Sequence, residues 1–117
     1  MASDLQRQRI KFTRCICLLL TWANVREGWE VALGRDFDEQ NEKLRHMRGS
    51  LHYLGLATDL AFYINGEYQT DSVAYKELGE KWKSLDPDCR WGGDFKDKNG
   101  KPRPDGNHFS VTYGNRS

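Results

Sequence analysis

The sequence predicts an α+β fold in which a small antiparallel β-sheet is flanked by helices. Apolar residues recur at helical spacing over residues 10–27 and again over residues 72–84. Short strand patterns lie between and after these two segments, and Asn65-Gly66 joins two of them with the strongest hairpin signal in the chain. Helices and hairpin-type strands mixed in this order indicate an antiparallel sheet.

The length and composition are those of one compact domain. A chain of 117 residues forms one hydrophobic core and is too short for two, so we expect a single domain over residues 1–117. Acidic and basic residues are interspersed and sum to +1, which gives no basis for a nucleic-acid partner. The three cysteines show no Cys-x-x-Cys spacing, which favours reduced thiols in a cytoplasmic setting over a disulfide framework.

The first helix follows a basic segment and faintly resembles a secretory signal. Its apolar run, residues 15–20, is too short to span a bilayer, and residues 21–24 make a poor cleavage site. We therefore expect an amphipathic helix over residues 10–27, ended by Gly28, and no stable membrane association. Its core-facing stripe comprises Phe12, Ile16, Leu19, Leu20 and Ala23.

The middle of the chain alternates between strand, loop and helix patterns. Residues 29–33 predict a strand stopped by Gly34, and the polar residues 36–47 predict a loop and short helix. A largely apolar strand over residues 56–64 leads through Asn65-Gly66 into residues 67–70. Asp71 or Ser72 is placed to cap a helix that runs to about residue 84, with Tyr75, Leu78 and Trp82 on one stripe.

The last third of the chain is predicted to hold a long loop and a closing strand. An Asp-Pro-Asp triplet at residues 86–88 stops the preceding helix, and residues 91–95 form a short strand or turn. Residues 96–106 are a polar loop. Residues 108–113 alternate, with His108, Ser110 and Thr112 on one face of a strand.

Residues 48–60 carry one histidine and one carboxylate, His52 and Asp59, seven positions apart. Seven extended residues span roughly 23 Å, so these side chains share a ligand only if the chain reverses between them. Gly55 permits that reversal, because glycine adopts positive φ at little cost. Taken alone, the spacing slightly favours His52 as a surface histidine and Asp59 as the partner of an arginine.

A second histidine, His108, follows the turn at residues 104–107 and opens the last strand. Two histidines and one carboxylate are the ligands of an open catalytic zinc site, with water in the fourth position. Asp105, three residues before His108, is placed to reach that water without binding the ion, as a general base must. Its simpler role is that of a turn aspartate. Together, Asp105 and His108 favour the metal interpretation of His52 and Asp59.

These residues stand in a pattern that resembles the zinc peptidases of peptidoglycan. That family comprises the D-alanyl-D-alanine carboxypeptidases and dipeptidases, and the L-alanyl-D-glutamate endopeptidases used as bacteriophage endolysins. The resemblance covers roughly residues 12–113 and is greatest to the endolysins. It implies the Hedgehog / DD-peptidase type of fold, a small antiparallel sheet with flanking helices. The matching motifs are Ser50-x-His52-x-x-Gly55-x-Ala57-x-Asp59, Trp91-Gly92-Gly93 and Asp105-x-x-His108-Phe109-Ser110.

The resemblance implies Zn²⁺ as the cofactor. It makes His52, Asp59 and His108 the zinc ligands and Asp105 the catalytic base. It also gives Ser50 the role of orienting a ligand.

Trp91, grouped with Trp82 and Tyr113, is a candidate to line a substrate groove, and core packing is at least as good a role for Trp82 and Tyr113. The resemblance also implies one contact with the substrate. An arginine upstream of the serine motif would polarise the scissile carbonyl. Arg35 and Arg48 are equal candidates for this role, because the Arg35 segment is one residue longer than the pattern of the family.

The function implied is that of a zinc metallopeptidase that cuts the L-alanyl-D-glutamate bond of peptidoglycan stem peptides. As an antimicrobial phage or prophage endolysin, it would be a monomer without a separate cell-wall-binding domain. It would stay in the host bacterial cytoplasm until a holin-type factor releases it to the wall. The alternatives are a D-alanyl-D-alanine carboxypeptidase or dipeptidase with the same site, or a non-catalytic, zinc-stabilised binding domain. The sequence leaves open the bond cut, the host range and any regulatory ion such as calcium.

Overall fold

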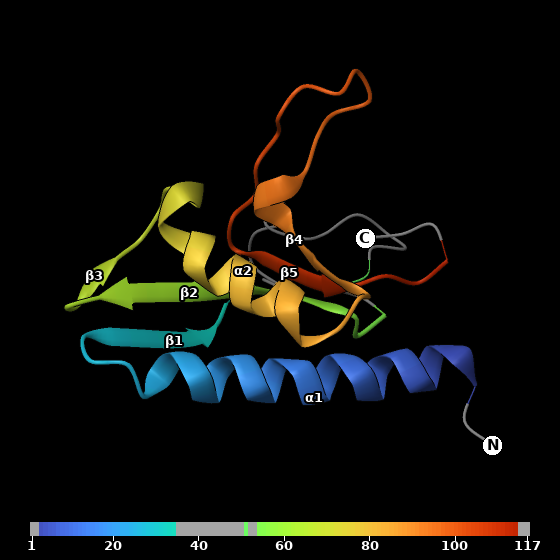
Figure 1. Cartoon of the computed structure of the whole chain (residues 1–117), viewed down its shortest axis with the longest axis horizontal. Helices are drawn as coiled ribbons and strands as arrows, with labels where there is room; N and C mark the ends of the chain where they lie inside the picture. Colours follow the sequence, from blue (N-terminus) through green and yellow to red (C-terminus); the bar gives the residue numbers. More distant parts are fainter. Residues whose placement is uncertain (1–2, 35–50, 52–53, 115–117) are drawn as a thin grey trace, which may run out of the picture.

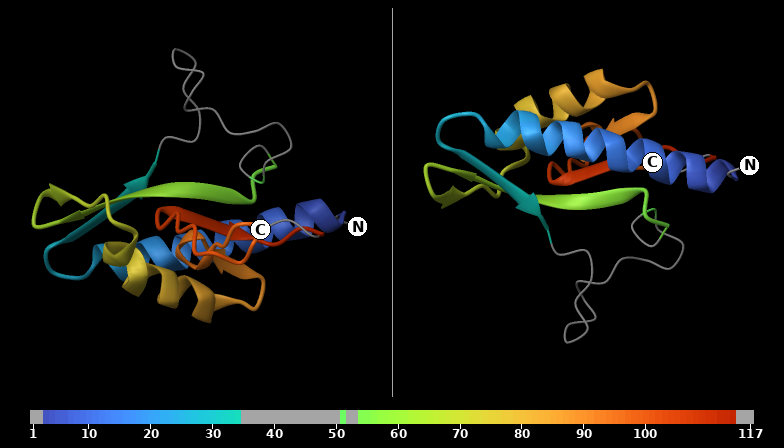
Figure 2. Two further views of the ribbon diagram at one scale, coloured as in Figure 1. Left: turned by 90° about the horizontal axis from the view of Figure 1, so that it is seen from above. Right: turned by 90° about the horizontal axis from the view of Figure 1, so that it is seen from below.

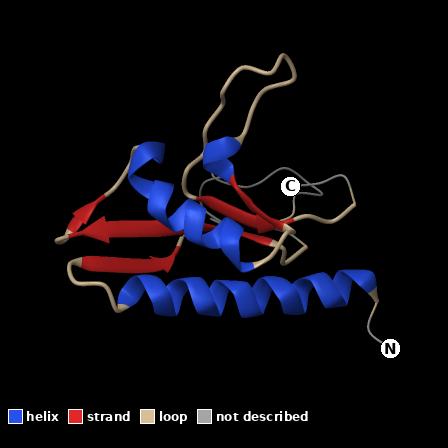
Figure 3. Ribbon diagram, in the orientation of Figure 1, coloured by secondary structure: helices blue, strands red, loops and turns tan. Residues whose placement is uncertain are grey.

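The computed structural model describes residues 3–34, 51 and 54–114. Within these residues, two α-helices and five strands follow one another as Figures 1 and 3 show. The elements are α1 (Asp4–Asn24), β1 (Trp29–Leu33), β2 (Ala57–Ile64), β3 (Glu67–Tyr68), the 3₁₀ turn η2 (Ser72–Tyr75), α2 (Lys76–Leu85), β4 (Cys89–Trp91), the 3₁₀ turn η3 (Gly92–Asp94) and β5 (His108–Val111).

The strands form one antiparallel sheet in the order β1-β2-β5-β4, with β3 paired to β2. The predicted α+β class with a small antiparallel sheet is therefore confirmed. Figure 2 shows that α1 and α2 lie on the same side of this sheet. The sheet thus has one helix-covered face and one face turned away from both helices.

The core fills the space between the helices and the covered face of the sheet. Trp82 of α2 is fully buried and makes edge-to-face contacts with Phe12 of α1, at 5.8 Å between ring centroids, and with Phe109 of β5, at 6.0 Å. Successive side chains of a strand point to opposite faces. Because Phe109 faces α2, His108 and Ser110 point to the opposite face.

Helix α1 begins earlier and ends earlier than the prediction of residues 10–27. Ser3 caps it through a capping box, in which the Ser3 and Gln6 side chains each accept a hydrogen bond from the other residue's backbone N–H. The extra N-terminal turn was missed because its residues are polar and give no apolar stripe. At the other end the helix stops at Asn24, and Gly28 lies in the turn before β1 with φ +80° rather than ending the helix.

Several predicted elements are confirmed with small shifts of their bounds. Strand β1 has the predicted bounds, and Asn65-Gly66 joins β2 to β3 with positive φ at both residues. The predicted helix over residues 72–84 opens with η2 and continues as α2 to residue 85. Strand β5 ends at residue 111, two residues before the predicted end, and the strand after the hairpin is only Glu67–Tyr68. The expected loop and short helix at residues 36–47 lies outside the described residues.

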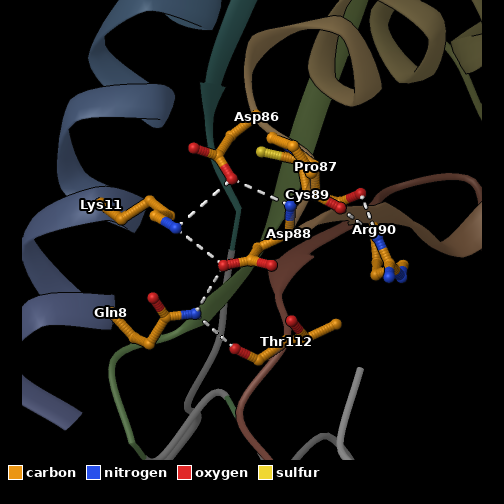
Figure 4. A network of polar contacts seen from close by, with 8 residues as sticks. All are labelled: Gln8, Lys11, Asp86, Pro87, Asp88, Cys89, Arg90 and Thr112. Atoms are coloured by element: carbon orange, nitrogen blue, oxygen red, sulfur yellow. Dashed lines mark hydrogen bonds and ion pairs between the residues drawn. The ribbon is translucent and has the colours of Figure 1, made fainter. Parts of the chain in front are cut away.

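A polar network ties α1 to the segment before β4 and to the end of β5 (Figure 4). Lys11 Nζ lies 2.7 Å from Asp88 Oδ2 and 3.4 Å from Asp86 Oδ1. The Gln8 side-chain amide donates to Asp88 Oδ2 at 3.2 Å and to the Thr112 carbonyl at 2.7 Å. The N-terminal half of α1 is therefore held by directed contacts as well as by apolar packing. None of the helices among the described residues is long and apolar enough to cross a membrane.

Candidate metal centre

Strand register brings Asp59 and His108 together. The two residues are directly paired across the antiparallel strands β2 and β5, so their side chains share a face. His108 Nδ1 lies 4.0 Å from Asp59 Oδ1. Hydrogen bonds between β2 and β5 fix the position of this pair. Next to it, the Leu60 N–H donates a hydrogen bond to the Asn107 carbonyl at 2.8 Å. The face that carries both residues is the one turned away from the helices.

Asp105 completes a cluster of three possible metal ligands. One carboxylate oxygen of Asp59, one of Asp105 and one ring nitrogen of His108 all lie within 4.8 Å of one another. The turn after Asp105 sets this approach, because the His108 N–H donates to the Asp105 carbonyl at 3.0 Å. Imidazole nitrogen and carboxylate oxygen are donors that zinc accepts, so this donor set fits a zinc ion.

The three side chains differ in their exposure. His108 is buried, Asp59 is partly buried and Asp105 is exposed. An ion held by the first two residues would therefore have Asp105 on its solvent side. This geometry suits Asp105 either as a third ligand or as a proton carrier beside the ion.

Gly92 makes the close approach of Asp105 and His108 possible. The Asp105 N–H donates to the Gly92 carbonyl at 2.8 Å. A Cβ atom at Gly92 would overlap the Asp105 carbonyl oxygen and would lie 2.7 Å from the His108 Cβ. Glycine is thus required here for packing. This close packing gives a physical reason for the glycine at position 92 of the Trp91-Gly92-Gly93 motif.

Trp91 holds the loop that carries Asp105 in place. Its indole N–H donates to the Gly106 carbonyl at 2.7 Å, midway between Asp105 and His108. The ring lies between Gly79 of α2 and Gly93, where a Cβ atom would overlap it. Trp91 is only 6% exposed, so in this structure it holds the loop that carries the site instead of offering an open face to a substrate.

Two residues that the sequence analysis did not assign to the site also contribute to it. The Ser72 hydroxyl accepts a hydrogen bond from the Gly106 N–H at 2.9 Å, and the Phe95 ring lies 5.0 Å from the His108 ring between centroids. Ser72 was read only as a helix cap and Phe95 only as part of a turn. Both roles depend on contacts across more than ten residues of chain, which spacing does not reveal.

Several predicted site residues fall on segments for which no structure is given. Arg35, Arg48, Ser50 and His52 lie outside the described residues. Gly55, by contrast, has φ +75°, the conformation that the predicted reversal requires.

The neighbouring backbone confirms a turn at this point. The Leu51 carbonyl accepts hydrogen bonds from the Leu54 N–H at 3.1 Å and the Leu56 N–H at 2.9 Å. The Leu51 side chain is buried in the core. The chain therefore turns back just before β2, which is the strand that carries Asp59.

Two hollows flank the cluster. One is lined by Asp59, Tyr63, Tyr68 and Asn107, among others, and runs along the exposed side of β2. The other is lined by Phe95, Lys96, Arg103, Pro104 and Asp105. Each hollow thus includes one acidic residue of the cluster, Asp59 in the first and Asp105 in the second.

With this geometry in place, the comparison with solved structures is informative. The chain shares its fold with an L-Ala D-Glu endopeptidase. This enzyme, ChiX of Serratia marcescens, superposes with a TM-score of 0.60 at 19% sequence identity, over 87% of this chain and 78% of the other. At this identity the likeness to ChiX establishes the fold alone. No protein-family model and no curated protein matches the chain.

Proposed function

We propose that this chain is a zinc-dependent peptidase of peptidoglycan that hydrolyses the L-alanyl-D-glutamate bond of stem peptides. The observation that carries the proposal is the convergence of Asp59, Asp105 and His108 on the face of the sheet that is turned away from the helices. The fold shared with an L-Ala D-Glu endopeptidase supports the same reaction class.

The proposed ligands are His108 and Asp59 together with His52. The first two are cross-strand neighbours on rigid, hydrogen-bonded strands, which favours a fixed coordination geometry. A zinc ion held there supplies Lewis acidity, which polarises a carbonyl group and acidifies water. Buried His108 and partly buried Asp59 would hold such an ion at a position with restricted access to solvent.

Asp105 is proposed to move the proton. Its exposed carboxylate lies on the substrate side of the cluster, where it accepts a proton from the attacking water and returns it to the departing amine. Arg35 or Arg48 is proposed to stabilise the negative charge that develops on the carbonyl oxygen. Ser50 is proposed to orient one of the ligands.

The biological role we propose is that of a phage or prophage endolysin. In this role a monomer acts on the wall of the host cell after a holin-type factor releases it from the host cytoplasm.

The test combines metal analysis with product analysis. Purified protein is expected to contain one equivalent of zinc and to release peptides from purified sacculi in a chelator-sensitive reaction. With a defined stem peptide, product masses should show a fragment that begins with D-glutamate. Release of free D-alanine would instead identify a D-alanyl-D-alanine carboxypeptidase. If the protein binds zinc but cleaves nothing even at high protein concentration, the result would favour a non-catalytic, zinc-stabilised binding domain over an enzyme.

A further inference from the structure

The loop between η3 and β5 carries a concentration of positive charge. Over residues 95–104 four basic residues stand against the single carboxylate of Asp97, in a chain whose net charge is only +1. This loop, orange in Figure 1, projects from the body of the molecule. Its two arms are held together by a bridge between Lys96 and Pro102 and by the Arg103 N–H, which donates to the Phe95 carbonyl at 2.8 Å.

Two of these basic residues are available to a ligand. Asp97 is engaged in the turn, since its carboxylate accepts hydrogen bonds from the Asn99 and Lys101 N–H groups at 2.8 and 3.0 Å. Lys83, on α2, is paired with Asp94 at 2.8 Å. Lys96 and Arg103 are exposed, and among the described residues neither forms an ion pair with a carboxylate.

Lys96 and Arg103 line the same hollow as Asp105. The hollow is completed by Phe95, whose ring also contacts the His108 ring at 5.0 Å, and by Pro104. The hollow is thus lined by one acidic residue of the candidate metal cluster and by two basic residues. A carboxylate ligand that enters this hollow would be attracted by the two basic residues.

The chemistry of the leaving group connects these cations to the proposed reaction. If Asp105 returns the proton to the departing amine, the leaving residue lies on the Asp105 side of the ion. In an amino acid the α-carboxylate carbon is two bonds, about 2.5 Å, from that nitrogen. A γ-linked D-glutamate keeps this carboxylate free, as does a C-terminal amino acid. An ordinary internal residue has an amide there.

We propose that Lys96 and Arg103 form a carboxylate subsite that selects peptide bonds whose leaving residue carries a free α-carboxylate. This inference rests on the proposed function, in that it assigns the leaving residue to the Asp105 side. The guanidinium of Arg103 offers a bidentate contact to a carboxylate, and Lys96 adds a second, charge-assisted hydrogen bond. Two sources share this chemistry: γ-linked D-glutamate in the stem peptide and a terminal residue such as D-alanine.

The test uses two stem peptides that differ only at the α-position of D-glutamate. One carries the free carboxylate and the other the carboxamide, and a third peptide ends in D-alanyl-D-alanine. We expect kcat/KM for the carboxylate peptide to exceed that for the carboxamide peptide by about tenfold or more. Comparison of the first and third peptides decides which source of the carboxylate is used. Equal cleavage of the carboxylate and carboxamide peptides would overturn the inference.

Variants locate the preference on the chain. Lys96→Gln combined with Arg103→Gln is expected to reduce the preference to within about twofold of unity, because neither charged contact remains. Lys98→Gln combined with Lys101→Gln removes the same charge from the same loop and should keep the full preference. All four positions are exposed, so stability should change little. A double variant at residues 96 and 103 that keeps the wild-type preference would refute the assignment.

A binding measurement separates this inference from the proposed function. The D-glutamate-initiated product peptide and its carboxamide are titrated into the zinc-loaded protein and followed by NMR. Preferential binding of the carboxylate, lost in the variant at residues 96 and 103, supports the subsite even if no wall peptide is cleaved. Equal binding of both, or binding of neither, overturns the subsite even if cleavage and its zinc dependence are established.

Discussion

At the scale of single residues, Asp105 is the side chain whose role matters most. It is close enough to Asp59 and His108 to join them as a ligand, yet it is the most exposed of the three. A ligand and a proton carrier have different consequences when removed, so substitution distinguishes them.

We predict that Asp105→Ala keeps zinc and loses turnover, by about 10²- to 10⁴-fold, as expected for loss of a general base. His108→Ala should lose both zinc and activity, because it removes a buried ligand. Zinc content of the purified variants and peptide release from sacculi are the two measurements. Asp4→Ala, at an exposed carboxylate in the first turn of α1, is the control. Loss of zinc from Asp105→Ala would make Asp105 a ligand, and near-normal activity would exclude it as the base.

Some residues of the candidate site could be predicted from the sequence, and others could not. Asp59, Asp105 and His108 were predicted from residue type and spacing to share one site, and the structure brings the three side chains together. Ser72 and Phe95 were not assigned to the site, because hydroxyl and phenyl groups become informative only through their neighbours. Such neighbours are set by packing between elements, which a local pattern does not contain.

At the scale of elements, the candidate site depends on how η3 and the loop before β5 are held against α2. Trp91 connects these pieces through its contact with Gly79 and its hydrogen bond to Gly106. Trp82, also buried, donates its indole N–H to the Arg90 and Ser110 carbonyls, at 3.0 Å each, and so ties α2 to β4 and β5. Trp82 and Trp91 are thus both buried and both donate to backbone carbonyls, but only Trp91 contacts the loop at residues 105–107.

We predict that Trp91→Phe weakens zinc binding by roughly 10- to 100-fold, the range for residues that orient metal ligands. Trp82→Phe loses comparable hydrogen bonding and volume but does not contact the loop at residues 105–107. It should therefore lower the free energy of unfolding while changing zinc affinity much less. Zinc affinity by competition with a chelating dye, together with urea unfolding, measures both quantities. Equal effects of the two variants on zinc affinity would contradict the supporting role of Trp91.

The network between α1 and the segment before β4 makes a separate prediction about pH. The hydrogen bond from Lys11 holds the pKa of the Asp88 carboxyl below its usual value. A carboxyl whose pKa is lower in the folded state stabilises the fold at pH values above its unfolded pKa, about 3.9. That contribution is lost as the pH falls through the folded pKa.

We therefore predict that Asp88→Asn is less stable than the wild type at neutral pH and that this gap closes below about pH 4. Because both side chains are partly exposed, the gap should not exceed about 1 kcal/mol. Lys11→Met should show the same closure, since it removes the other partner. Urea unfolding between pH 2 and pH 7 measures the gap. A gap that stays constant over this range would mean that the ion pair contributes nothing to stability.

At the scale of the whole molecule, zinc and folding are expected to be coupled. The proposed ligands Asp59 and His108 belong to adjacent central strands, so an ion held by both binds the folded state and not the unfolded chain. Zinc at 100 times its Kd adds about 2.7 kcal/mol to the stability.

We predict that saturating zinc raises the thermal midpoint by roughly 10 °C relative to chelator-treated protein. Scanning calorimetry of the metal-free and zinc-loaded forms checks this shift. His108→Ala is the control, and its midpoint should not respond to zinc. An unchanged wild-type midpoint would argue against a zinc site that bridges β2 and β5.

The fold as a whole was predicted more completely than its boundaries. The antiparallel α+β class followed from the Asn65-Gly66 turn and from the apolar stripe of Tyr75, Leu78 and Trp82, which are local signals that survive in the structure. The start of α1 at Asp4 did not follow, because a polar first turn stabilised by the Ser3 cap lacks apolar periodicity. The order β1-β2-β5-β4 depends on pairing between distant segments and was not predicted.

The pairing of Asp59 with His108 has a consequence for how the molecule matures. These residues are 49 positions apart in the sequence, so they meet only after distant segments of the chain have joined. A slip of one residue between β2 and β5 would turn Asp59 toward the helices and replace it beside His108 by a neighbour without a carboxylate. Binding of an ion by this pair therefore requires that β2 and β5 have paired in the native register. The proposed metal site is therefore completed only when β2 and β5 have paired, late in the assembly of the fold.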